Sequence, residues 1–183
     1  MITVITRQRL SSWVRSLTDY ERKWCLWLNI AGRVDGVRRF FAFISWLGNG
    51  KFWYVMMPML IAIYGQEAIK PVLHMGITAL VGIAVYLFLK NRLVRERPFA
   101  SMQSISKGAP PIDQYSFPSG HMLHAVSFSM ITLSYYPILF WWLVPFTALI
   151  ALSRVILGLH YPTDVLAGAA LGAGLASVSF YLV

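Results

Sequence analysis

Long apolar runs, rather than alternating positions, dominate the hydrophobic pattern of the chain. Such runs favour helices over β-strands. A helix that spans a bilayer needs about 20 mostly apolar residues, and five segments approach that length. They cover residues 52–65 (with a backward extension to about residue 45), 69–89, 121–136, 138–158 and 164–183. We therefore predict an all-α, polytopic transmembrane helical bundle of five to six membrane helices.

The N-terminal third is apolar but interrupted by charge. The runs WCLWLNI and FFAFISWL are separated by a stretch that contains Arg33, Asp35, Arg38 and Arg39. Charges inside a bilayer are costly unless they have partners, which disfavours one straight span through both runs. We expect an interfacial or re-entrant helical pair, starting with an amphipathic segment near residues 8–23. A sixth span through residues 24–48 stays open.

Composition supports a membrane protein and narrows its partners. The chain is 57% hydrophobic and 13% charged, whereas soluble domains carry about 25% charged residues. Its formal net charge of +9 suits nucleic acid, anionic lipid headgroups or an acidic substrate, and a membrane protein favours the last two. Cys25 is the single cysteine, so no internal disulfide forms. The opening MITVITRQRLSSWVRS has no apolar core, so we expect no signal peptide.

Counting membrane crossings brings the polar residues to one face. The second span ends near residues 90–98, and the third begins near 119–121. The fourth ends near 153–154, and the fifth begins near Asp164. Since successive spans run in opposite directions, all four places lie on the same side of the bilayer. The sequence therefore predicts one polar site.

The first polar cluster is KNRLVRERP, residues 90–98. On a continuous helix, Lys90 and Arg97 project from nearly the same side, about 10 Å apart along the axis, and Pro98 stops the helix. Two such cations suit a phosphate. The alternative for Lys90 and Arg97 is that they are simple anchors or topology signals, because basic residues commonly flank membrane spans. We assign the anchor role to Arg92 and Arg95, which lie off this face.

The second cluster is FPSGH, residues 117–121. Ser119 suits a helix N-cap, and Gly120 lets a ligand approach the backbone. The first free N–H groups of the helix then point at an anion. His121 follows and suits proton transfer. The alternative is a capping turn with an incidental histidine, and we expect nearby His124 to be structural.

The third cluster is SRVILGLHYPTD, residues 153–164. Arg154 supplies a further cation for a phosphate. His160 lies just before Pro162, which fits the first turn of a helix. Four residues after His160, the Asp164 carboxylate can turn back to one imidazole nitrogen and stabilise the cation formed when the other nitrogen attacks. A structural ion pair remains the alternative.

A metal site is disfavoured. A ligand set could be assembled from His121, His124, His160, Asp113 and Asp164. The neighbouring arginines and lysines, however, oppose a divalent cation. Neither an HExxH motif nor a cysteine-pair spacing is present. We predict no metal and no other cofactor.

Together the clusters read K-x6-RP, PSGH and SR-x5-H-x3-D, which resembles the signature of the type 2 phosphatidic acid phosphatase superfamily. The matching positions are Lys90, Arg97, Pro98, Pro118, Ser119, Gly120, His121, Ser153, Arg154, His160 and Asp164. The resemblance implies one membrane phosphatase domain over residues 1–183. Its catalytic helical core covers 51–183, and its amphipathic or re-entrant part covers 1–50.

The resemblance also implies a reaction through a phosphohistidine without a metal. His160 attacks phosphorus, Asp164 orients it, and His121 protonates the leaving oxygen and then helps to activate water. The phosphoryl oxygens are held by the remaining site residues, Lys90, Arg97, Ser119, Gly120 and Arg154. One histidine must be neutral and the other protonated, so a bell-shaped pH profile is expected.

The substrate implied by a site at a membrane face is a lipid phosphate or pyrophosphate. The candidates are undecaprenyl pyrophosphate, phosphatidylglycerophosphate or phosphatidate, and lipid A 1-phosphate. Small size resembles bacterial members, which implies an inner membrane location with the site facing the periplasm or outside. A lipid-phosphate binder or carrier without turnover, and an anion channel, are the competing hypotheses; neither would need the His160, His121 and Asp164 set. The natural lipid and the oligomeric state stay open.

Overall fold

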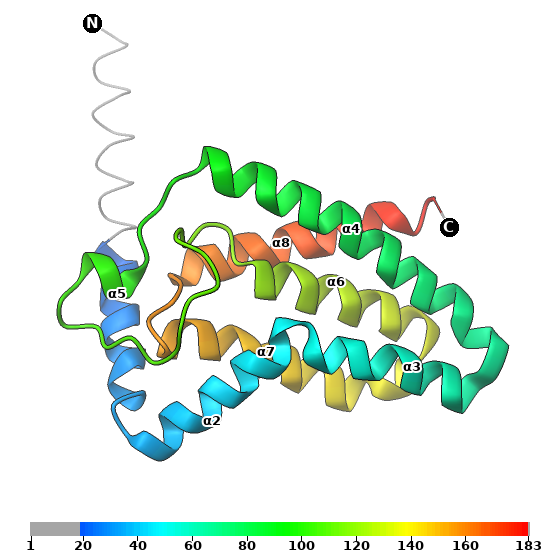
Figure 1. The fold of residues 1–183 in the computed structure, drawn as a ribbon, viewed down its shortest axis with the longest axis horizontal. Coiled ribbons are helices and arrows are strands. Elements are labelled where there is room, and N and C mark those ends of the chain that lie inside the picture. Colours follow the sequence, from blue (N-terminus) through cyan, green and yellow to red (C-terminus); the bar gives the residue numbers. More distant parts are fainter. Residues whose placement is uncertain (1–18, 183) are drawn as a thin grey trace, which may run out of the picture.

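The chain folds as a helical bundle around one central helix. The computed structural model describes residues 19–182. The central helix, α6 (Gly120–Tyr135), packs against α4 (Ile69–Arg92), α7 (Phe140–Ile156) and α8 (Pro162–Ser179). Figure 1 shows α4, α6 and α8 side by side, with the short α5 (Pro98–Ser101) at one end of the bundle. No strand occurs in the described part of the chain, as the apolar pattern predicted.

The N-terminal third forms two helices rather than one span. Residues 19–31, called the N-terminal helix below, are followed by a turn at 32–34 and by α2 (Asp35–Trp46). The break falls among the charged residues that disfavoured a straight helix. An irregular turn at Leu47–Lys51, with Gly50 at φ +92°, then separates α2 from α3 (Phe52–Tyr64). Most of the amphipathic segment expected at 8–23 lies outside the described residues.

The predicted spans match helices α3, α4, α6, α7 and α8, but one boundary was wrong. We expected the helix after residue 69 to continue through Arg97 and to stop at Pro98. Helix α4 instead ends at Arg92, residues 94–97 are extended, and Pro98 is the first residue of α5. Proline is favoured in a first helical turn as well as after a helix end, so its presence alone did not decide between the two.

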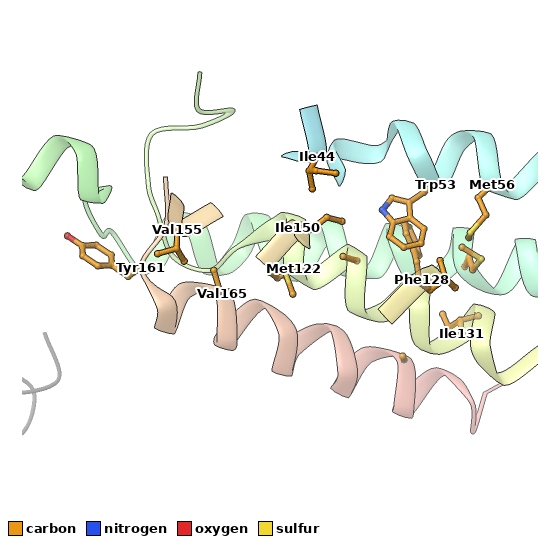
Figure 2. Packing of buried hydrophobic residues seen from close by; sticks show 14 of the residues in the cluster. Ile44, Trp53, Met56, Met122, Phe128, Ile131, Ile150, Val155, Tyr161 and Val165 are labelled. Atoms are coloured by element: carbon orange, nitrogen blue, oxygen red, sulfur yellow. The ribbon is translucent and has the colours of Figure 1, made fainter. Parts of the chain in front are cut away.

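The interior is apolar, and so is much of the exterior. Figure 2 shows Trp53 of α3 against Phe128 of α6 within the core, with ring centroids 5.2 Å apart. Outside, Leu80, Trp141 and Trp142 are exposed by 69%, 78% and 76%. The stretches Asp35–Arg92, which contains α2 to α4, and Pro137–Ile156 are long and apolar enough to cross a membrane. This exterior suits lipid, and the fold is a transmembrane bundle.

Glycines allow α6 and α8 to approach closely. A Cβ added at Gly168 would lie 2.3 Å from the Ser119 carbonyl oxygen, and one at Gly172 would lie 2.3 Å from that of Leu123. Both contacts involve backbone atoms, which cannot move aside as a side-chain tip can. Small residues at these positions therefore hold the N-terminus of α6 against α8, as in other membrane helix pairs.

Candidate active site

Four side chains from the three polar clusters meet at one cavity. The cavity has a volume of about 370 Å³, and its walls include Arg97, His121, Arg154 and His160. The Nη1 atom of Arg97 lies 3.3 Å from Nε2 of His160. Similarly, Nη1 of Arg154 lies 3.4 Å from Nε2 of His121. Each histidine is therefore next to a guanidinium group.

His160 is positioned by the turn that joins α7 to α8. The backbone N–H groups of Leu159 and His160 both donate to the Arg154 carbonyl, at 3.0 Å, and Gly158 has φ +70°. The imidazole is 2% exposed. Burial lowers the pKa of His160 well below its ordinary value, and the charges of Arg154 and Arg97 lower it further. The side chain is therefore neutral near pH 7, with a lone pair available for attack.

Asp164 lies behind His160, in the first turn of α8. Its Oδ2 atom is 3.8 Å from Nδ1 of His160, which is too long for a hydrogen bond. The same oxygen accepts a hydrogen bond from the Tyr161 N–H at 2.8 Å. The predicted approach of the carboxylate to the ring is present without a formed bond, and Nδ1 has no hydrogen-bond partner among the described residues. Such bonds often tighten only when substrate binds.

Arg154 is a buried cation with little compensation. It is 2% exposed, and its Nη1 donates to the Ser45 hydroxyl of α2. Within residues 19–182 it forms no salt bridge with a carboxylate, and its Nε atom has no hydrogen-bond partner. A buried charge without a counterion is unfavourable. The site is therefore arranged to accept an anion.

Lys90 and Arg97 converge on a carboxylate that the sequence did not assign. Oδ1 of Asp113 lies 2.8 Å from Nζ of Lys90 and 2.7 Å from Nη2 of Arg97, and Tyr86 donates to its other oxygen. Burial alone would raise the pKa of Asp113, but the close contact with Lys90 and the hydrogen bond from Tyr86 outweigh it, and the pKa is lowered. Lys90 and Arg97 thus meet although they do not share a helix.

The N-terminus of α6 borders the same cavity. Ser119 is the N-cap, as predicted, and its backbone N–H donates to the Asp164 carbonyl at 3.1 Å. Its buried hydroxyl has no hydrogen-bond partner in the described part of the chain. Gly120 is in the cavity wall, where an added Cβ would lie 2.9 Å from the Tyr86 ring. Since Gly120 is the first helical residue, its N–H is free of intrahelical bonding.

Three predicted site residues stand outside the cavity wall itself. Lys90, Ser119 and Asp164 are 5%, 0% and 0% exposed, and none of them lines the cavity. Each of the three lies next to a residue of the cavity wall. Lys90 forms an ion pair with Asp113, Asp164 approaches His160, and Ser119 precedes Gly120 in the chain. All eight predicted site residues therefore either line the cavity or lie next to a residue that lines it.

Arg95 was wrongly assigned as a plain anchor. Its Nη1 atom donates to Oδ1 of Asp164 at 2.6 Å, and its Nη2 atom donates to Oε2 of Glu21 at 2.5 Å. Charge spacing in the sequence could not reveal this, because the extended segment before Pro98 turns Arg95 toward α8. Ser45, Tyr86 and Glu21 were also missed, since no motif contains them.

The cavity continues from the polar residues along apolar ones. Its wall includes Trp53, Tyr54 and Met57 of α3, and it follows α4 from Tyr86 back to Gly76. That distance along a helix is about 15 Å. His124 also lines the cavity, and its Nδ1 atom has no hydrogen-bond partner within residues 19–182. In the same part of the chain, no group of three or more His, Cys, Asp or Glu side chains is arranged to hold a metal ion.

Comparison with known proteins identifies the family. Residues 71–183, which contain every motif position, match the model of the PAP2 superfamily. The chain belongs to the PAP2 superfamily. The matched region includes the three clusters. The N-terminal helix, α2 and α3 lie before it.

Curated relatives of this PAP2 member include phosphatases of polyprenyl lipids. It is 32% identical over 114 residues to an undecaprenyl-diphosphatase of Bacillus subtilis, an alignment that covers 62% of this chain and 58% of that protein. It is 30% identical over 139 residues to a decaprenylphosphoryl-5-phosphoribose phosphatase of Mycobacterium tuberculosis, with 74% of each chain covered. The chain thus spans little more than half the length of the Bacillus relative.

Solved structures share the fold. The crystal structure of Aquifex aeolicus LpxE superposes with a TM-score of 0.71 at 21% identity and covers 84% of this chain and 92% of that one. A transmembrane PAP2 type phosphatidylglycerolphosphate phosphatase from Bacillus subtilis superposes with a TM-score of 0.64 at 20% identity, covering 91% and 86%.

Proposed function

We propose that this protein is an integral membrane phosphatase that hydrolyses a lipid phosphate or pyrophosphate through a phosphohistidine. The observation that carries the proposal is that one cavity is lined both by Arg154, which is buried and has no carboxylate partner within residues 19–182, and by His160, which is buried and neutral. A phosphoryl group supplies the missing negative charge and the electrophile together. Membership of the PAP2 superfamily and the phosphatases among its relatives support the same reaction class.

The first chemical step forms a bond between Nε2 of His160 and phosphorus while the bond from phosphorus to the leaving oxygen breaks. His121, which lines the cavity beside Arg154, gives a proton to that oxygen. The Asp164 carboxylate, 3.8 Å from Nδ1, stabilises the positive charge that develops on the attacking ring.

The second step releases phosphate. Water attacks phosphorus, gives a proton to His121, and the bond from phosphorus to His160 breaks, which restores both side chains. Throughout, Arg97 and Arg154 face the charge on the phosphoryl oxygens from the cavity wall, and Lys90 adds its positive charge from beside Asp113. The Ser119 hydroxyl and the Gly120 N–H are the further donors. Fixed donors of this kind, already oriented before substrate arrives, are the main catalytic requirement of phosphoryl transfer.

The apolar part of the cavity favours a lipid as the substrate. Residues of α3 and α4 line about 15 Å of it beyond Tyr86, a surface that suits a hydrocarbon chain attached to the phosphate. The candidates remain undecaprenyl pyrophosphate, phosphatidylglycerophosphate or phosphatidate, and lipid A 1-phosphate. The names of the relatives favour a polyprenyl lipid.

We further propose a location in the inner (cytoplasmic) membrane of a bacterium, with the site facing the periplasm or outside. The transmembrane phosphatase among the solved structures supports the membrane location. Single cysteines placed at residues 101–110 of a cysteine-free variant test the orientation. Labelling of intact cells by a membrane-impermeant maleimide supports an outward site. Labelling only after lysis contradicts it.

The function itself is tested with detergent-solubilised protein in the presence of EDTA. Phosphate release is measured from a prenyl pyrophosphate, phosphatidate, phosphatidylglycerophosphate and lipid A. We expect turnover of at least one lipid, its loss in His160→Ala with lipid binding retained, and no comparable loss in His74→Asn, a histidine outside the cavity wall. A wild-type protein that binds these lipids but releases no phosphate would instead support the carrier.

A further inference from the structure

The geometry points to Glu21 and Arg95 as positioning residues for the Asp164 carboxylate, which makes the N-terminal helix part of the catalytic apparatus. This inference rests on the proposed function, because its consequence is measured on the phosphohistidine step. Glu21 lies outside the region that matches the family model.

The contacts from Asp164 through Arg95 to Glu21 are called the relay below. Asp164, at one end of it, is fully buried. One carboxylate oxygen accepts from Arg95 Nη1 at 2.6 Å and the other from the Tyr161 N–H at 2.8 Å. These two bonds hold opposite sides of the carboxylate. Arg95 and the local backbone therefore fix the orientation of the Asp164 carboxylate, and with it the distance from Oδ2 to the His160 ring.

Arg95 is itself held by three further contacts. Its Nη1 atom also donates to the Thr163 hydroxyl at 2.9 Å, and its guanidinium lies 3.9 Å from the centre of the Tyr161 ring. Its other arm, Nη2, donates to Glu21 at 2.5 Å. The planar guanidinium connects two carboxylates in one fixed geometry, which a lysine cannot reproduce.

Glu21 closes the relay from a different part of the chain. It is 8% exposed. One oxygen binds Arg95, and the other accepts from the Thr163 N–H at 3.1 Å. Thr163 is in the first turn of α8, where backbone N–H groups lack intrahelical partners. Glu21 therefore anchors both Arg95 and the helix that carries Asp164.

The charges explain why a second carboxylate is useful. Arg95 alone would neutralise Asp164 and weaken its attraction for a charged imidazole. With Glu21 present, Arg95 is shared between two carboxylates, and the group keeps a net charge of about −1. That charge complements the positive charge that develops on His160 during phosphoryl transfer.

The N-terminal helix packs closely against the rest of the protein along the face that carries Glu21. Its buried positions are Glu21, Cys25 and Asn29, spaced four residues apart and so on one face of the helix. The Asn29 amide donates to the Ser106 and Ile156 carbonyls at 3.0 and 2.9 Å. These contacts join the helix to the connection between α5 and α6, and to the end of α7.

The test compares Glu21→Gln with Asp19→Asn, the same chemical change at an exposed position of the same helix. In steady-state assays of the full chain, we expect Glu21→Gln to lower kcat between about 10- and 100-fold, as for other partners that orient a functional side chain. KM and the inhibition constant of orthovanadate should stay within about twofold, because the cations at the cavity are unchanged. Asp19→Asn should match wild type.

Two further variants keep the inference open to refutation if Glu21→Gln folds poorly. Arg95→Lys retains the charge but cannot donate to two carboxylates at once, so it should also lower kcat. Glu21→Asp retains a carboxylate and should have a higher kcat than Glu21→Gln. Equal kcat in Glu21→Gln and Asp19→Asn would overturn the relay, and so would a joint loss of kcat, vanadate inhibition and thermal stability. If wild type hydrolyses no lipid phosphate, the proposed function fails rather than the relay.

Discussion

At the scale of single residues, Arg154 has the least compensated charge in the site. Its guanidinium is buried against Ser45 and His121 and forms no salt bridge within residues 19–182. A phosphoryl group would complete its bonding, and the benefit would grow as charge develops in the transition state.

Arg154→Ala should therefore reduce kcat/KM by about 10²- to 10³-fold, the usual loss for one donor to a transition-state oxygen. The measurement is phosphate release by purified protein in detergent. Arg92→Ala is the matched control, because Arg92 is exposed at the end of α4 and stacks on Phe88. Equal losses in the two variants would contradict a specific role for Arg154.

The pH profile tests the protonation state of His160. Burial and the charges of Arg154 and Arg97 lower its pKa, so the ring stays neutral and nucleophilic below its ordinary titration range near 6.5. We expect protonation of His160 to lower kcat/KM only below that pH. Profiles for two lipid phosphates separate this effect from ionisation of the substrate, because only the substrate's own pKa values change between them. A substrate-independent acid limb above pH 7 would contradict the neutral ring.

Asp113 forms ion pairs with Lys90 and Arg97, the cations that a substrate phosphate would also contact. Its lowered pKa means that its stabilisation is present at neutral pH and is lost as pH falls through the carboxyl range. Asp113→Asn should cost on the order of 1–3 kcal/mol at pH 7, lower Tm by several degrees, and show a larger rise in Tm with added phosphate than wild type.

Thermal unfolding in detergent measures the Asp113 effect, with Asp35→Asn as the control because Asp35 forms an exposed pair with Arg38. The difference between Asp113→Asn and wild type should shrink toward acid pH. A variant as stable as wild type at pH 7, with no greater response to phosphate, would show that the ion pairs contribute nothing.

At the scale of elements, close packing of α6 against α8 sets the position of His121 and Ser119. Gly172→Ala should cost about 1–3 kcal/mol and reduce activity, because its Cβ would lie 2.3 Å from the Leu123 carbonyl oxygen. Gly174→Ala is the control, since an added Cβ there meets nothing within 4 Å and alanine is the better helix former. Matching Tm values for the two variants would contradict this packing argument.

Helix starts were more predictable than the connections between helices. Ser119 and Pro162 carry local signals for a helix N-terminus, and α6 and α8 begin beside them. The course of residues 93–119 depends on distant partners. The Ser116 N–H donates to the Arg95 carbonyl, and Arg97 donates to the Leu159 carbonyl. No periodicity reports such contacts, and for this reason Arg95 and Asp113 were not assigned.

At the scale of the whole molecule, the charged site lies at one end of an apolar bundle. Figure 1 shows α5 and the connection between α7 and α8 gathered at that end, beside the N-terminal helix. Hydropathy and the spacing of the motifs predicted this arrangement, because the span count alone brings the clusters together. They did not predict that the N-terminal helix would contribute Glu21, since its single buried carboxylate has no motif around it.

The central claim is that His160 carries the phosphoryl group between the two steps. The most direct measurement is rapid quenching of the protein at alkaline pH during turnover of a labelled lipid phosphate with EDTA present, followed by mapping of the labelled peptide by mass spectrometry. We predict an acid-labile phosphohistidine at residue 160 that is absent in His160→Ala. A label on another residue, or full turnover by His160→Ala, would contradict the account.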